Sequence, residues 1–229
     1  MVGFRIAQRI TDFMFPAYCA VCNAPLARNE NTVCTACLNR LPFAELPFTA
    51  DNAVSRILHV KIPVYKATAL MLYDKNGASG RLIHALKYEG AQHIGTFLAR
   101  LTAPLLRQDP PDYVIPIPLH PKKLRQRGYN QLDSYGKTLA SLIGAKFKKG
   151  VLHKKTHTPS QTTKNPLERW KNVRSGFRVK CPNRLRGSHI LLIDDVLTTG
   201  ATLAAAGEAL LKNCPDIRLS VTVMAVNLR

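Results

Sequence analysis

The chain has 229 residues, of which 46% are hydrophobic, enough to bury an ordinary globular core. Its 33 lysines and arginines outnumber its 14 aspartates and glutamates, and the formal net charge of +19 predicts an anionic partner. No apolar run approaches the roughly 20 residues that span a bilayer, so we expect no membrane insertion.

The amino terminus is predicted to form a short amphipathic helix followed by a metal site. Charged residues interrupt the apolar positions of residues 1–15, unlike the apolar core of a signal peptide, and we therefore expect a cytoplasmic protein. Two Cys-x-x-Cys pairs follow, Cys19 with Cys22 and Cys34 with Cys37, as in the knuckles of a zinc ribbon. Four thiolates complete the closed shell of a structural zinc site. Disulfides are disfavoured in the cytoplasm, and a redox protein normally has one such pair.

The rest of the chain alternates between predicted strands and helices. A proline-containing linker at 41–51 divides it, so we predict a zinc-binding domain at 1–50 and a second domain at 51–229. Strands are predicted at 67–73, 113–119, 189–193 and 217–226, and helices at 79–88, 94–106, 130–143 and 202–213. Such alternation is typical of a parallel sheet covered by helices.

A basic, polar stretch interrupts this pattern. Residues 121–186 hold 18 lysines and arginines but only two acids, Asp133 and Glu168. From about residue 153 to 186 few positions are apolar, and we predict a long loop there. Such a loop in a compact domain is usually functional or disordered. Its cations are either simply solvated or contact phosphate or nucleic acid.

The most informative run is an apolar strand followed by two acids and a turn rich in threonine, at Asp194-Asp195-Val196-Leu197-Thr198-Thr199-Gly200-Ala201-Thr202. Two carboxylates at the end of a buried strand are costly unless they meet cations, a metal or hydroxyl groups. The turn offers hydroxyls, backbone N–H groups and a helix amino terminus to an anion, and Gly200 lets the backbone approach a phosphate. Helix capping alone would explain one threonine rather than three.

This run resembles the motif that binds phosphoribosyl pyrophosphate (PRPP) in type I phosphoribosyltransferases. Further segments are similar to the ComF family: Tyr113-Val-Ile-Pro-Ile-Pro118 with the basic residues up to Gln131, Ser160-Gln161, Arg169-Trp-Lys-Asn172-Val-Arg-Ser-Gly-Phe177, and Leu86-Lys87-Tyr88. The resemblance covers nearly the whole chain. It implies an α/β fold of the type I phosphoribosyltransferase kind, a parallel sheet with flanking helices, preceded by a four-cysteine zinc ribbon.

The resemblance also implies a binding site. The two acids would hold the ribose hydroxyls of PRPP and the turn its 5′-phosphate, so the binding set is Asp194, Asp195, Val196, Leu197, Thr198, Thr199, Gly200, Ala201 and Thr202. The loop after Pro118 reaches the same edge of the sheet, where Lys122, Arg125 and Arg127 would face the pyrophosphate. A loop at 154–172 would cover the ligand through Gln161, Arg169 and Asn172. Mg²⁺ would accompany PRPP.

Three functions remain open. ComF-family proteins act in natural transformation, so the first is a cytoplasmic PRPP-binding protein that handles incoming single-stranded DNA, with a DNA-uptake helicase as partner. Weak, non-specific DNA binding would use the 13 cations of 146–186, with Phe147, Trp170 and Phe177 as stacking faces. The second is an active phosphoribosyltransferase with an unknown acceptor, for which no catalytic residue is assigned. The third is a structural adaptor with a vestigial PRPP site.

Overall fold

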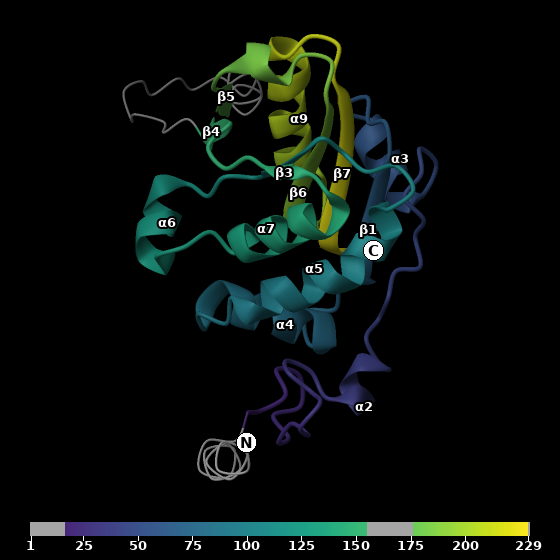
Figure 1. Ribbon diagram of the computed structural model, residues 1–229, viewed down its shortest axis with the longest axis vertical. Coiled ribbons are helices and arrows are strands. Elements are labelled where there is room, and N and C mark those ends of the chain that lie inside the picture. Colours follow the sequence, from purple (N-terminus) through teal and green to yellow (C-terminus); the bar gives the residue numbers. More distant parts are fainter. Residues whose placement is uncertain (1–16, 155–175, 229) are drawn as a thin grey trace, which may run out of the picture.

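The computed structural model describes residues 17–154 and 176–228 (Figure 1). Five features expected from the sequence lie outside these ranges, namely the amino-terminal helix and the residues Gln161, Arg169, Trp170 and Asn172.

The core is a parallel five-stranded sheet in the order β1-β7-β6-β2-β3. Its strands are β1 (Ala67–Leu72), β2 (Tyr113–Pro116), β3 (Lys146–Phe147), β6 (His189–Leu197) and β7 (Arg218–Val226). Consecutive residues of β6 and β7 are buried, so both faces of the sheet are covered there. This explains why both strands are near-continuous apolar runs in the sequence. The expected α/β fold with a parallel sheet is confirmed.

Helices connect the strands and cover the sheet (Figure 1). They are α3 (Ala53–His59), α4 (Ala78–Tyr88), α5 (His93–Leu106), α6 (Pro121–Arg127), α7 (Leu132–Ile143) and α9 (Ala201–Asn213). Small residues allow close packing between them. A Cβ atom added to Gly95 of α5 would lie 2.2 Å from the hydroxyl oxygen of Ser134 in α7. Buried Tyr135 of α7 also donates a hydrogen bond to Thr102 of α5, at 3.2 Å.

The strands and helices predicted from periodicity are present within a few residues, but two segments near the predicted site differ. The cations expected on a loop after β2 lie on helix α6. His120 accepts a hydrogen bond from the backbone N–H of Lys122 (3.2 Å), Pro121 occupies the first helical position, and Gly128 ends the helix with φ +80°. Strand β6 continues to Leu197 instead of ending at residue 193, because its backbone stays paired with β7.

The predicted long loop at 153–186 is wrong at both of its ends. Strand β4 (Leu152–Lys154) pairs antiparallel with β5 (Phe177–Val179), and a 3₁₀ helix follows at Pro182–Leu185. Phe177 is only 7% exposed. Its ring is therefore not a free stacking face for a nucleic-acid base, contrary to the expectation.

The segment 41–51 is not a free linker. It runs along the outer edge of β1, where Phe43 pairs with Met71 and the Ala44 N–H donates to the Leu70 carbonyl at 2.9 Å. An edge strand carries unpaired backbone groups, and this segment satisfies some of them. The proposed domain boundary at residue 50 remains a prediction.

The cysteine segment, residues 17–41, lies beyond α4 at one end of the molecule (Figure 1). It contains the one-turn helix α2 (Thr35–Leu38). Buried Val33 and Leu41 belong to the same apolar cluster as the sheet residues. The Arg81 guanidinium of α4 donates a hydrogen bond of 2.8 Å to the carbonyl of Val21 and so attaches this segment to the main body.

None of the helices in the described ranges has both the length and the apolar character needed to cross a bilayer.

Candidate functional site

Four cysteines from two turns of the cysteine segment converge on one point. The sulfur atoms of Cys19, Cys22, Cys34 and Cys37 all lie within 4.8 Å of one another, and those of Cys22 and Cys34 are 3.8 Å apart. Zn–S bonds of about 2.3 Å in a tetrahedron place the sulfurs about 3.8 Å apart. The expected cluster is confirmed, and its donor set fits a metal such as zinc.

The protein backbone favours the thiolate form of one ligand. Burial opposes ionisation of Cys19, but backbone N–H groups of Cys22, Cys34 and Val21 stabilise the charged sulfur and lower its pKa to about 6. Burial and hydrogen bonding with the other thiols raise the pKa of Cys37 to about 12. A bound dication stabilises both thiolates, so metal binding here releases protons.

At the carboxyl end of the sheet, Asp195 of β6 is buried and held by two other elements. The ammonium group of Lys87, in α4, lies 3.0 Å from one carboxylate oxygen. The Gln131 side chain, just before α7, donates to the other oxygen and accepts from Arg127 of α6. Three cations of α6 were predicted to lie at the site, namely Lys122, Arg125 and Arg127. Of these, Arg127 is connected to Asp195 through Gln131. Lys87 and Gln131 were not predicted as site residues, although both lie in the segments that carry the resemblance to ComF proteins.

Asp194 is half-buried and electrostatically different from its neighbour. Burial and repulsion by Asp195 raise its pKa to about 8, against the opposing effects of the Asp195 backbone N–H, at 2.9 Å, and of the cations Lys87 and Lys154. Without a ligand, this carboxyl group therefore holds its proton to a higher pH than an ordinary aspartate does.

The threonine-rich turn forms a small hollow beside Asp194. The hollow measures about 50 Å³ and is lined by Asp194, Val196, Leu197, Thr198, Thr199, Gly200, Ala201, Thr202 and Leu203. Gly200, with φ +73°, precedes the first residue of α9, and no side chain caps this helix. A Cβ atom on Gly200 would lie 3.3 Å from Leu58, so the turn also packs closely on α3. The first backbone N–H groups of α9 have no partner within the helix and are available to an anion.

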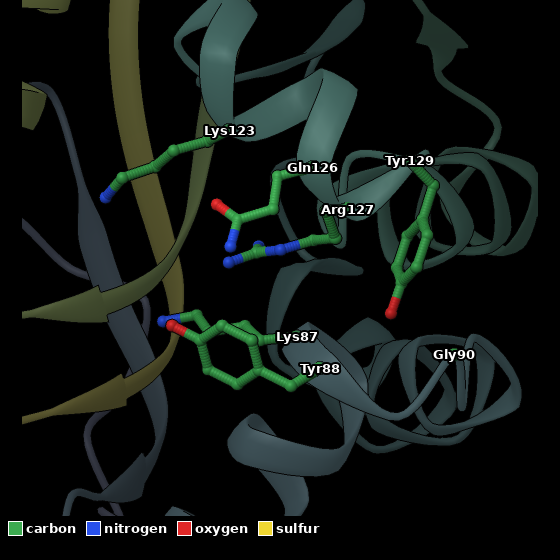
Figure 2. Close-up of a pocket in the computed structure, with 7 residues that line it drawn as sticks. All are labelled: Lys87, Tyr88, Gly90, Lys123, Gln126, Arg127 and Tyr129. Carbon is green, nitrogen blue, oxygen red and sulfur yellow. The ribbon is translucent and has the colours of Figure 1, made fainter.

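A larger hollow of about 370 Å³ lies between α4 and α6. Figure 2 shows its lining, which consists of Lys87, Tyr88, Gly90, Lys123, Gln126, Arg127 and Tyr129. Side chains of α6 extend toward α4, and the Arg127 guanidinium lies 5.0 Å from the centre of the Tyr88 ring. Lys122 and Arg125 are exposed and do not line this hollow.

Residues 136–226 match the model of the phosphoribosyl transferase domain. The matched region is similar to phosphoribosyl transferase domains and contains the acid pair, the threonine-rich turn and α9.

Curated relatives cover more of the chain. DNA utilization protein YhgH of Salmonella typhimurium is 27% identical over an alignment of 213 residues, and the match covers 86% of this chain and 92% of the relative. Competence protein F of Haemophilus influenzae is 28% identical over an alignment of 139 residues, and the match covers 57% of this chain and 61% of the relative. The resemblance to the ComF family is confirmed by these proteins.

Solved structures with lower similarity include two proteins whose names refer to phosphoribosyl chemistry. Glutamine PRPP amidotransferase from B. subtilis is 13% identical, with a TM-score of 0.41 over 61% of this chain and 30% of the other. Adenine phosphoribosyltransferase from Saccharomyces cerevisiae is 19% identical, with a TM-score of 0.34 over 61% of this chain and 79% of the other.

The cysteine cluster predicts one zinc ion per chain. Elemental analysis of protein purified without chelator should find about one equivalent, because four thiolates close the coordination shell. Cys37→Ser should reduce the content below half an equivalent and lower the unfolding temperature, since bound metal stabilises the folded state. Cys181→Ser, which removes an exposed cysteine outside the cluster, is the control and should keep the metal. Metal-free wild-type protein would contradict the assignment.

The acid pair predicts a pH-dependent loss of stability in the ligand-free protein. The pKa of Asp194 is raised to about 8 in the folded state, from an ordinary value of 3.8 that applies when the chain is unfolded. Between these values the folded state binds more protons, so the free energy of unfolding falls as pH rises. Asp194→Asn should therefore raise this free energy by at least about 1 kcal/mol near neutral pH, and by less at about pH 5. Urea unfolding at both pH values tests this, with the exposed Asp216→Asn as control. Equal effects at both pH values would refute it.

Proposed function

We propose that the chain is a PRPP-binding protein that acts in natural competence or the use of DNA, and that PRPP binds at the carboxyl end of β6. The observation that carries the proposal is the hollow formed by Asp194, the threonine-rich turn and the uncapped start of α9, within a phosphoribosyl transferase domain. A helix amino terminus with free N–H groups suits a phosphate. In the proposal, residues 198–202 bind the 5′-phosphate.

The two acids have different parts in this proposal. Successive side chains of a strand point to opposite faces, and Asp195 is already held by Lys87 and Gln131. Asp194 borders the hollow and is the acid that a ribose hydroxyl would meet. When bound, Mg²⁺ would supply positive charge beside Asp194 and the pyrophosphate, which favours the ionised carboxylate. Asp195 then keeps Lys87 and Gln131 in position near the ribose.

The pyrophosphate of PRPP is proposed to lie toward α6. The 370 Å³ hollow presents Lys87, Lys123 and Arg127 to a ligand, and charged donors of this kind bind phosphate oxygens strongly. Lys122 and Arg125 are exposed on the same helix and are proposed to act at longer range. Three further contacts are proposed for residues outside the described ranges, namely Gln161, Arg169 and Asn172.

Catalysis is the second candidate function. The phosphoribosyl transferase domain favours transfer of a phosphoribosyl group to an acceptor, with the cations of α6 stabilising the leaving pyrophosphate. The uncapped α9 and the bordering Asp194 argue against a vestigial site, because both leave polar groups beside the hollow that a ligand can use. We assign no catalytic residue.

DNA is the proposed second partner. The relatives are named for DNA utilization and competence, and the chain carries a net charge of +19. We propose weak binding of single-stranded DNA through exposed cations in 146–186, including Lys148 and Lys180. Because Phe177 is buried and Phe147 packs on Gly136, the described part of this surface would contact phosphates rather than stack on bases.

The proposal places the protein in the cytoplasm, because a thiolate zinc site and free thiols persist in a reducing compartment. A DNA-uptake helicase is the proposed protein partner there.

PRPP binding predicts a thermal shift. PRPP with Mg²⁺ should raise the unfolding temperature of the wild type, because a ligand that binds the folded state stabilises it. Asp194→Asn should abolish the shift, and Thr199→Val should weaken binding by about 1 to 3 kcal/mol, the cost of one hydrogen bond to a charged group. Calorimetric titration measures both. Asp216→Asn is the matched control and should bind normally. A wild type that does not bind PRPP would refute the proposed function.

DNA binding through the basic surface predicts a strong salt dependence. The logarithm of the affinity for a single-stranded oligonucleotide should fall with the logarithm of salt concentration, with a slope of about −0.7 per phosphate contact. Replacing both Lys148 and Lys180 by Glu should weaken DNA binding more than replacing both Lys61 and Lys212 by Glu. The second pair of substitutions changes the net charge by the same amount at exposed positions elsewhere. Fluorescence anisotropy provides the comparison. Equal losses in the two variants would assign the binding to net charge alone.

A further inference from the structure

A groove of about 490 Å³ runs along α4, and we call it the α4 groove. Its walls come from three segments: Ala20 of the cysteine segment, the residues Tyr73, Lys75 and Asn76 after β1, and α4 with the residue that follows it. Its volume lies within the range of small-molecule sites. It is also placed at the carboxyl end of a parallel strand, where open α/β sheets bind ligands.

Two cations of the α4 groove, Lys75 and Arg81, form no ion pair with a described acid. The Arg81 guanidinium bonds instead to the carbonyl of Val21. Glu89 also lines the groove, and its carboxylate lies 3.1 Å from the His84 ring nitrogen, so the three lining cations outnumber the one lining acid. The groove therefore favours a small anion such as a phosphate group.

An aromatic ring accompanies these cations. Tyr88 is 67% exposed, although it is large and mostly apolar. Its ring contacts two side chains: the Arg127 guanidinium lies 5.0 Å from the ring centre, and the centre of the His84 ring lies 5.0 Å away with a tilt of 47°. An exposed, oriented ring beside cations is the arrangement on which nucleic-acid bases stack. The basic stretch at 146–186 offers no such ring among its described residues.

We propose that the α4 groove binds a nucleotide, with the base stacked on Tyr88 and the phosphate held by Lys75 and Arg81. The inference rests on the proposed function in that it places the nucleotide beside the PRPP site. Lys87 lines both the groove and the hollow of Figure 2, and it pairs with Asp195. A free nucleotide and a nucleotide unit of a single strand share this chemistry.

The test uses ethenoadenosine monophosphate, a fluorescent nucleotide, titrated into the full chain without PRPP. Tyr88→Ala should weaken binding about tenfold, because stacking on one aromatic side chain contributes about 1 to 3 kcal/mol per base. Tyr88→Phe keeps the ring and should bind like the wild type. Lys75→Ala should weaken binding about threefold or more, whereas Lys61→Ala, the matched control, should not. Ethenoadenosine, which has no phosphate, should be insensitive to Lys75→Ala.

Wild-type protein that does not bind the nucleotide, or variants Tyr88→Ala and Lys75→Ala that bind as the wild type does, would overturn the inference. A PRPP-induced thermal shift, measured on the same samples, separates the two proposals. Nucleotide binding without this shift supports the groove and refutes the PRPP site, and the reverse result refutes the groove alone. An unlabelled single-stranded oligonucleotide that displaces the probe identifies the source as a strand; failure to displace it identifies a free nucleotide.

Discussion

The arrangement of the site depends on one constraint, the burial of the Asp195 carboxylate on β6, an interior strand of the sheet. Asp195 lies within a strand that is otherwise apolar, and an unpaired charge there would be strongly destabilising. Lys87 and Gln131 satisfy it from two different helical regions, and Arg127 is drawn in through Gln131. The same interaction that makes the buried acid tolerable therefore gathers α4, α6 and α7 around the end of β6. Asp194 accepts a backbone hydrogen bond and is left with a raised pKa, facing the hollow.

Periodicity predicted the regular elements because it reports burial directly. Strands β6 and β7 bury consecutive residues and the helices bury one face, and both patterns are visible in the sequence. The errors fell where tertiary pairing outweighs local signals. Prolines made residues 41–51 look like a linker, but the open edge of β1 needed partners. The acids seemed to end β6, but pairing with β7 carries the strand to Leu197. The α6 segment looked like a loop, but His120 caps it.

For the candidate site too, local motifs could be predicted from the sequence but contacts between distant residues could not. The acids and threonines of β6 and the four cysteines form local patterns whose spacing carries the chemistry, so the sequence was sufficient to find them. Gln131 meets Asp195 across 64 residues, and Lys87 reaches it from another helix. No local pattern encodes such contacts, because they depend on the order of strands in the sheet. Phe177 was misjudged for the same reason, since its burial comes from the β4–β5 pair.

Helix α4 connects the cysteine segment to the acid pair. It fixes both the distance between Arg81 and Lys87 along the helix axis and the angle between them about that axis. Arg81 holds the carbonyl of Val21 near one end of the helix, and Lys87 holds Asp195 near the other. The two contacts are about 9 Å apart along the axis, at about 1.5 Å per residue. One residue inserted between them would turn Lys87 by about 100° relative to Arg81, so both contacts could not be kept. The length of α4 between these residues is therefore more tightly constrained than the identity of the residues in between.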